Sequence, residues 1–248
     1  MFSPVGIYSN VIDAYLSDFR GKATLPMIGG FMLQAATRHA EERGFGYSAM
    51  TSQKKVWVLI RMAIEIFEYP KNDTEIKVHT WVADVNKMFT ERCFAFEDDK
   101  GNYFGYARSV WAAIDLETRR PTNVLELEGL SDYINDKPCP IASTGKIPLL
   151  KEGNELSASF TVKYSDIDIN KHLNSIKYIE HFVDVFPIEM FQQKEIRRFE
   201  ISYIMEGQYG TTLNIFEKTD PENEGVFILE MKREDKAICS SKVIWKEI

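Results

Sequence analysis

The chain has 248 residues, 44% of them hydrophobic, and a formal net charge of −7 at pH 7. This length fits one large domain or two modest ones, and the apolar content is ordinary for a globular protein. The negative charge argues against nucleic acid as a partner. No apolar run approaches the roughly 18 residues that a membrane-spanning helix needs, so we expect no membrane span.

The N-terminal residues and the cysteines indicate the compartment. Met1 to Gly6 contain neither a basic region nor an apolar stretch, and they lack the Arg/Ser-rich character of a transit peptide, so we predict no targeting signal. Cys93, Cys139 and Cys239 are few and far apart, which is typical of a reducing compartment. We therefore expect a cytoplasmic, bacterial protein.

The first half predicts one helix followed by a sheet. Thr24 can cap a helix with Pro26 near its first position, apolar residues recur at helical spacing through Ala40, and Gly44 supplies a stop. Alternating or β-branched segments then predict antiparallel strands, with a turn at 98–102. These strands are expected at 56–60, 62–67, 75–82, 89–97 and 103–114.

The second half repeats this plan. A strand at 160–164 leads into a helix from about Asn174 to Phe186, and further strands are expected at 199–205, 211–218, 226–232 and 237–245. A proline-containing segment with a short helix near Glu126 separates the halves. The sequence thus predicts a tandem α+β protein, with a first domain at 1–125, a linker at 126–154 and a second domain at 155–248.

The segment from Asp166 to Asn174, just before the second predicted helix, carries most of the chemistry-bearing side chains. In an extended segment alternate side chains share a face, so Asp168, Asn170 and His172 would point the same way. A carboxylate, an amide and an imidazole at the start of a helix suit hydrolysis of an activated carbonyl.

Metal binding and covalent catalysis fit this segment less well, whereas simple helix capping fits it easily. Its start resembles a calcium loop, but Lys171 replaces the required glycine and Lys177 the required glutamate. Zinc would need more His or Cys nearby, and no serine or cysteine nucleophile motif is present. Asp and Asn are ordinary caps before a helix, and from composition alone a purely structural role is the stronger hypothesis.

A family resemblance changes that balance. The run from Ser165 to Ile179 resembles the active-site segment of acyl-acyl-carrier-protein (acyl-ACP) thioesterases, the plant plastid enzymes and their bacterial relatives. Further similar segments extend the resemblance in order over nearly the whole chain. They include 24–26, 57–59, 61–62, 69–70, 80–82, 109–111 and 118–120. The resemblance implies a double hot-dog fold, in which each unit is a long helix wrapped by a twisted antiparallel sheet.

The resemblance also implies the catalytic residues. The family's Asp-x-Asn-x-His triplet falls on Asp168, Asn170 and His172, and a later family glutamate falls on Glu206. Many plant members carry a cysteine after that glutamate, whereas this chain has Gly207. The expected site therefore uses carboxylates, an amide and an imidazole, with Asp168 as general base or as nucleophile and Asp166 in a supporting or capping role.

The implied reaction is hydrolysis of a fatty acyl thioester on acyl carrier protein, which releases a free fatty acid and needs no metal or cofactor. The resemblance places the acyl chain in the first unit, and plausible wall residues are Met27, Phe31, Trp57 and Met62. Each of these four can equally be an ordinary core residue. An acidic carrier could dock on a basic cluster, either Arg119-Arg120 or Lys194 with Arg197-Arg198.

Three alternatives stay open from the sequence. The nearest is an acyl-CoA thioesterase with the same chemistry, which turnover of matched substrates would distinguish. A hydratase or dehydratase of related fold would release no free thiol. A non-catalytic acyl-thioester binding module would need an output device, and the sequence shows none before Thr24. The chain is expected to be a monomer or a homodimer.

Overall fold

The computed structural model describes residues 2–150, 154–220 and 223–248, so linker residues 151–153 lie outside the described part. The chain divides into two compact units, Met1–Ser143 and Thr144–Ile248. Within the described residues, no helix is both long and apolar enough to cross a membrane.

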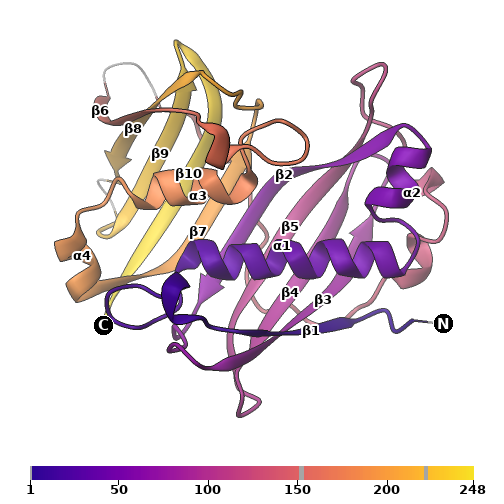
Figure 1. Cartoon of the computed structure of the whole chain (residues 1–248), viewed down its shortest axis with the longest axis horizontal. Helices are drawn as coiled ribbons and strands as arrows, with labels where there is room; N and C mark the ends of the chain where they lie inside the picture. The colour runs from indigo at the N-terminus through magenta and orange to yellow at the C-terminus, as the bar shows by residue number, and fades with distance from the viewer. Residues whose placement is uncertain (1, 151–153, 221–222) are drawn as a thin grey trace. The chain divides into compact units, whose positions relative to one another are not determined.

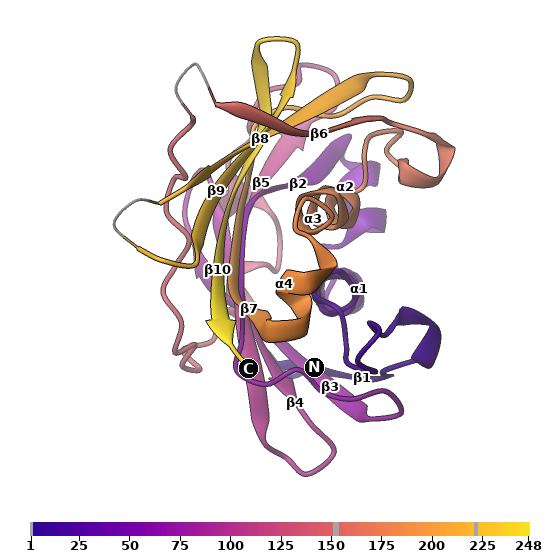
Figure 2. The same ribbon diagram turned by 90° about the vertical axis from the view of Figure 1, so that its left-hand side faces the viewer.

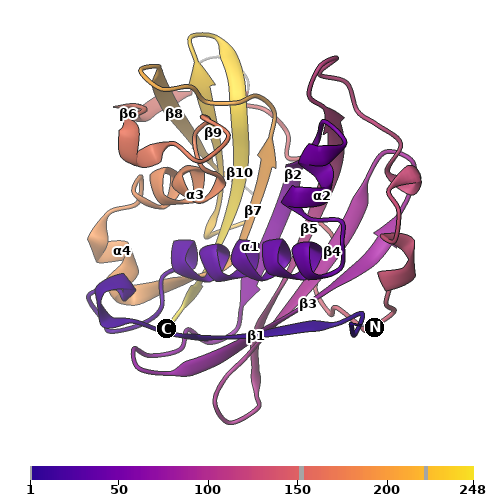
Figure 3. The same cartoon turned by 45° about the vertical axis from the view of Figure 1, so that its right-hand side comes forward.

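The first unit is a five-stranded antiparallel sheet with one long helix across it (Figures 1 and 3). Its strand order is β1-β3-β4-β5-β2. The strands are β1 (Gly6–Val11), β2 (Lys55–Ile66), β3 (Glu75–Val85), β4 (Thr90–Glu97) and β5 (Tyr103–Asp115). The helices are α1 (Leu25–Glu42) and the short α2 (Tyr47–Ser52), with 3-10 turns at Ala14–Leu16, Val124–Glu126 and Ser131–Tyr133.

The second unit has the same plan, with strand order β6-β8-β9-β10-β7. Its strands are β6 (Glu155–Thr161), β7 (Lys194–Tyr203), β8 (Thr212–Thr219), β9 (Val226–Arg233) and β10 (Lys236–Glu247). Its helices are α3 (Ser175–Val183) and α4 (Ile188–Gln193), after a 3-10 turn at Tyr164–Asp166. Figure 2 shows α3 end-on, within the concave side of this sheet. The predicted tandem α+β architecture is confirmed.

Helix α1 begins and ends where the sequence predicts. The Thr24 hydroxyl accepts a hydrogen bond from the backbone N–H of Met27 (3.3 Å), and Pro26 occupies the first turn, where it costs no hydrogen bond. Gly44 adopts φ +80°, a left-handed conformation that glycine takes without steric cost. The buried residues recur at helical spacing and set the face that packs on the sheet: Leu25, Met27, Ile28, Met32, Ala35, Ala36, His39 and Ala40.

The sheet of the first unit is buried on both faces. Along β4, Phe94 and Phe96 alternate with Cys93 and Ala95, and all four are at most 1% exposed. Cys93 and Ala95 pack in one cluster with Ile141 from the segment after β5. Alternate side chains point to opposite faces, so this segment covers the face away from α1.

A buried polar cluster fastens the N-terminal segment to α1. The fully buried His39 ring contacts the Pro4 carbonyl oxygen through Nε2 (3.0 Å), and Arg92 Nη1 lies 3.0 Å from its Nδ1. Arg92 Nη1 also donates to the Thr80 hydroxyl (3.2 Å). Because a guanidinium can only donate, Nδ1 must be the acceptor, so the ring is neutral with its proton on Nε2.

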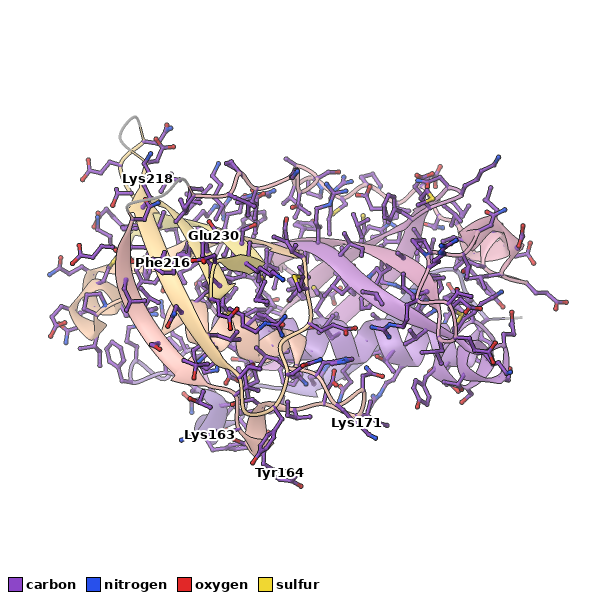
Figure 4. The ribbon with its side chains drawn as sticks, turned by 90° about the horizontal axis from the view of Figure 1, so that it is seen from above. Lys163, Tyr164, Lys171, Phe216, Lys218 and Glu230 are labelled. Atoms are coloured by element: carbon purple, nitrogen blue, oxygen red, sulfur yellow. The ribbon has the colours of Figure 1, made fainter. Side chains whose placement is uncertain are left out.

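A buried carboxylate anchors the start of the second unit. Glu230 on β9 is 2% exposed, and its Oε2 accepts a hydrogen bond from the backbone N–H of Leu150 (2.6 Å). Lys232 Nζ lies 3.6 Å from the other carboxylate oxygen and over the Phe216 ring, so the buried charge is partly compensated. Glu230 and Phe216 are labelled in Figure 4. The core of this unit contains the fully buried Phe182 of α3 and Phe199 of β7.

Candidate active site

The segment around Asp168 is a tight turn. The backbone N–H of Asp168 donates to the His172 carbonyl (3.0 Å), and the N–H of Lys171 donates back to the Asp168 carbonyl (3.0 Å). Lys171 adopts φ +65° to close the turn. The expectation of an extended segment with alternate side chains on one face is therefore wrong, because these local hydrogen bonds reverse the chain.

The Asp168 carboxylate stabilises this turn through one oxygen. Its Oδ1 accepts the backbone N–H groups of Asn170 (2.8 Å) and His172 (3.4 Å). Within the described chain, Oδ2 makes no hydrogen bond, and the residue is partly exposed. The turn thus fixes one carboxylate oxygen and leaves the other available to a water molecule or a substrate.

Asp166 and Asn174 hold the turn against α3. The Asn174 side chain caps the helix by accepting the N–H of Ile176 (2.8 Å), and the N–H of Asn174 donates to the Asp166 carbonyl (2.8 Å). The Asp166 carboxylate accepts the N–H of Lys163 (2.8 Å). Both residues therefore satisfy backbone groups around the turn, which is the supporting role expected for Asp166.

His172 and Glu206 come together from distant parts of the second unit. Nε2 of His172 lies 3.1 Å from Oε2 of Glu206, and the two side chains are 27% and 40% exposed. Backbone pairing sets this contact: His172 bridges to Gln208, and the N–H of Leu173 donates to the Gly207 carbonyl (2.8 Å). Asn170 is exposed on the same turn. The structure thus pairs the imidazole with a carboxylate at the end of the turn that Asp168 begins.

Tyr178 is a positioning residue that the sequence did not indicate. Its hydroxyl accepts the backbone N–H of Gly207 (2.9 Å) and donates to the Met205 carbonyl (3.5 Å), on either side of Glu206. Burial raises the pKa of Tyr178 well above its usual value, so the phenol stays protonated. The sequence shows only a tyrosine on the apolar face of an amphipathic helix, and such a residue more often packs in the core without any role at a site.

Gly207 occupies a position without room for a side chain. A Cβ atom there would lie 3.0 Å from Leu173 Cβ and 3.1 Å from both Leu173 Cδ2 and Tyr178 Oη. We therefore expect Gly207→Cys to lose about 1–3 kcal/mol of unfolding free energy through overpacking and to hydrolyse no faster than the wild type. Urea unfolding and the rate of thiol release measure the two effects.

The chain offers a matched control for this substitution. A Cβ at Gly30, on α1, would meet no atom within 4 Å, so Gly30→Cys should keep or slightly raise stability. Equal loss of stability in both variants, or a faster Gly207→Cys enzyme, would contradict the steric explanation.

The four proposed acyl-pocket residues lie in the first unit. Met27 on α1 and Met62 on β2 are buried, at 7% and 0% exposure, whereas Phe31 and Trp57 are half-buried. The Trp57 indole N–H donates to the Phe45 carbonyl (2.8 Å), which ties β2 to the segment after α1. Their role in binding an acyl chain stays a prediction.

The first unit contains the same turn. Oδ1 of Asp18 accepts the N–H groups of Arg20 (2.8 Å) and Lys22 (3.0 Å), and the N–H of Asp18 donates to the Lys22 carbonyl (2.8 Å). Gly21 takes φ +68°, the counterpart of Lys171 at φ +65°. The hydrogen-bond framework of the Asp168 turn is therefore present twice in the chain.

The side chains on the two turns differ in their chemistry. Arg20 and Lys22 stand where the second unit has Asn170 and His172. The N–H of Ala23 donates to the Pro70 carbonyl, as that of Leu173 does to Gly207, so Tyr69 takes the place of Glu206. The first turn keeps the backbone fold and the aspartate of the second but lacks counterparts of Asn170, His172 and Glu206.

No cluster of His, Cys, Asp or Glu able to hold a metal ion occurs in the part of the chain that the structure describes. Two repeats of a helix packed on an antiparallel sheet, with 18 residues in α1 and 9 in α3 and a polar turn before each, define a tandem hot-dog protein.

Comparisons with known proteins agree with this class. Residues 9–129 match the acyl-ACP thioesterase N-terminal domain and residues 150–247 the acyl-ACP thioesterase C-terminal domain. This chain therefore belongs to the acyl-ACP thioesterase family.

A solved acyl-ACP thioesterase from Bacteroides thetaiotaomicron is 43% identical, with a TM-score of 0.92 over 98% of both chains. The 12:0-ACP thioesterase from Umbellularia californica shares the fold at 17% identity, with a TM-score of 0.89 over 100% of this chain and 99% of that one.

Curated plant relatives are more distant and longer. Oleoyl-acyl carrier protein thioesterase 2 of Arabidopsis thaliana is 25% identical over 87% of this chain. Acyl-[acyl-carrier-protein] hydrolase FATB3 of Cuphea viscosissima is 29% identical over 73% of it. The matched regions cover 63% and 46% of those proteins, respectively.

Proposed function

We propose that this chain hydrolyses fatty acyl thioesters on acyl carrier protein and releases free fatty acid. The observation that carries the proposal is the His172–Glu206 contact (3.1 Å) beside the Asp168 turn. It lies in a chain whose two halves both match the acyl-ACP thioesterase family. The names of its relatives, acyl-ACP hydrolases and thioesterases, support the same reaction.

Asp168 is proposed as the general base. Its Oδ1 is held by two backbone N–H groups, so Oδ2 has a fixed position from which to take a proton from water. The oxygen of that water attacks the thioester carbonyl, and the negative charge passes to the carbonyl oxygen. The exposed Asn170 amide can donate to that oxygen, a contact typically worth about 3 kcal/mol in the transition state.

His172 is proposed to complete the proton transfer. Collapse of the tetrahedral intermediate breaks the carbon–sulfur bond, and the departing thiolate takes a proton to leave as a free thiol. His172 can pass that proton on from Asp168, and the Glu206 carboxylate, 3.1 Å from Nε2, holds the imidazole in place. The reaction consumes one water and yields one carboxylic acid and one thiol.

The two units are proposed to divide the work. Residues 1–125 would bind the acyl chain against Met27, Phe31, Trp57 and Met62, and residues 155–248 would carry the catalytic groups. Residues 126–143, expected as linker, pack on the first unit, with Leu127 and Leu130 in its core. The three cysteines are all free and buried, which suits the proposed bacterial cytoplasm. The proposed assembly is a monomer or homodimer that acts without nucleic acid or cofactor.

Release of free thiol from a panel of acyl carrier proteins with different chain lengths tests this function. The expected result is steady thiol release with an equal amount of fatty acid. Matched acyl-CoA substrates serve as the comparison. Faster turnover of acyl-CoA at every chain length would make the chain an acyl-CoA thioesterase, and carrier binding without thiol release would make it a binding module.

A further inference from the structure

The rim of the candidate active site exposes large apolar side chains. Tyr164, just before the turn, is 89% exposed, and Ile169, between Asp168 and Asn170, is 78% exposed. Tyr209, on the loop that carries Glu206, is 69% exposed. Contact of apolar side chains with water is unfavourable, and a partner that covers them removes it. Exposed apolar side chains that lie together therefore indicate an interaction surface.

Two lysines extend from this rim into solvent. Lys163 and Lys171 are exposed, and Figure 4 shows them projecting with Tyr164 from the same margin of the second unit. The nearby carboxylates are partly exposed and have partners: Asp166 accepts the N–H of Lys163, Asp168 accepts that of Asn170, and Glu206 lies beside His172. In a chain with a net charge of −7, these two lysines give the rim exposed cations whose side chains have no carboxylate partner in the described residues.

Lys171 occupies a position where glycine is the easier choice. It adopts φ +65°, and the equivalent residue of the first turn is Gly21 at φ +68°. A side chain in this conformation is strained, so the backbone alone does not explain a lysine there. Its ammonium group gives the rim a cation directly between Asn170 and His172.

We propose that Lys163, Tyr164, Ile169 and Lys171 form the docking surface for the acyl carrier, a partner with acidic and apolar side chains around its thioester arm. The inference rests on the proposed function. Charge complementarity selects this surface over the Lys194–Arg198 cluster, because Lys194 pairs with Glu247 (2.8 Å) and Arg198 with Glu200 (2.7 Å). Docking at the rim would deliver the thioester next to Asp168 and His172.

The test compares one acyl group on three thiols: acyl carrier protein, coenzyme A and N-acetylcysteamine, which offers no carrier surface. The measured quantity is the ratio of kcat/KM for the carrier substrate to that for the N-acetylcysteamine ester. We expect Lys163→Glu/Lys171→Glu to lower this ratio about tenfold or more at low ionic strength. In about 0.5 M salt the difference in this ratio between the wild type and the variant should become smaller, because salt screens the charges. Tyr164→Ser should lower it independently of salt.

Two further variants separate docking from folding. Lys171→Gly removes the cation and relieves the strained conformation, so the ratio should fall while Tm stays at or above that of the wild type. Lys218→Glu reverses an exposed lysine on β8, at the opposite margin of the second unit (Figure 4), and should leave the ratio unchanged.

An unchanged ratio in the double variant would overturn the inference. So would an equal loss with acyl-CoA, because the rim would then recognise the phosphates of coenzyme A. Calorimetric titration of wild type and double variant with acylated carrier reports docking without turnover. Weaker binding by the variant would support the surface even if the wild type released no thiol, an outcome that would refute only the proposed hydrolysis.

Discussion

Replacing Asp168 by asparagine is expected to lower kcat for acyl-carrier-protein hydrolysis by about 10²–10⁴-fold, the usual contribution of a general base. The asparagine oxygen can still accept the N–H groups of Asn170 and His172 that now bind Oδ1. The turn should therefore persist while the proton acceptor is lost. Thiol release under saturating substrate measures the rate, and thermal unfolding reports whether the turn survives.

Asp18 provides an internal control for this experiment. It makes the same two backbone hydrogen bonds in the first unit, to Arg20 and Lys22, but its Oδ2 pairs with Arg20 (2.7 Å) and its turn has no counterpart of His172 or Glu206. Asp18→Asn should leave kcat within about twofold of the wild type and change stability by about 1 kcal/mol or less. If a folded Asp168→Asn protein kept near-wild-type activity, Asp168 would not be the general base.

Acidification is expected to destabilise the first unit through His39. Burial, followed by the positive charge of Arg92, lowers the pKa of His39 from 6.5 to about 3, while the hydrogen bond to Pro4 opposes the shift. Protonation would remove the acceptor that Arg92 uses and place two cations side by side in the core. The neutral imidazole is therefore required in the folded state.

The direction of this pH dependence follows from proton binding. Between pH 6.5 and pH 3 the unfolded chain binds a proton at His39 that the folded chain does not bind. The stabilisation is complete above pH 6.5 and is lost as the pH falls toward 3, by an amount on the order of 4 kcal/mol. Urea unfolding at a series of pH values within this window measures the slope.

Carboxylates also titrate at low pH, so a variant is needed to isolate the histidine. In His39→Gln, which cannot titrate, the unfolding free energy should fall less steeply between pH 6.5 and pH 4 than in the wild type. If the two proteins show parallel pH profiles, His39 does not control acid stability.

The sequence predicted the repeated elements because their periodicity reflects burial. Strands such as 75–82 and 103–114 combine β-branched residues with clear turn signals, and their positions agree with β3 and β5. Strand β1 was not predicted, because Gly6–Val11 is an edge strand whose side chains are mostly exposed. The predicted helix to Phe186 ends earlier, at Val183, and a separate short helix follows Pro187.

Residue types could nominate the site but could not give its geometry. The resemblance pointed to His172 and Glu206, and the structure brings them within 3.1 Å. The reversal at Lys171 was not predicted, because a lysine is an unusual residue for a left-handed conformation. Tyr178 was missed since its contacts with Gly207 and Met205 arise only when α3 packs beside the end of β7.

The two copies of the turn share one backbone framework but carry different side chains. Asp18 and Asp168 close the same loop, yet only the second loop is followed by an imidazole with a carboxylate beside it. A gene that encodes the loop twice within one chain can let each copy evolve independently, which an assembly of identical subunits cannot do. In this chain the second copy carries the His172–Glu206 pair, whereas the first keeps the backbone framework alone.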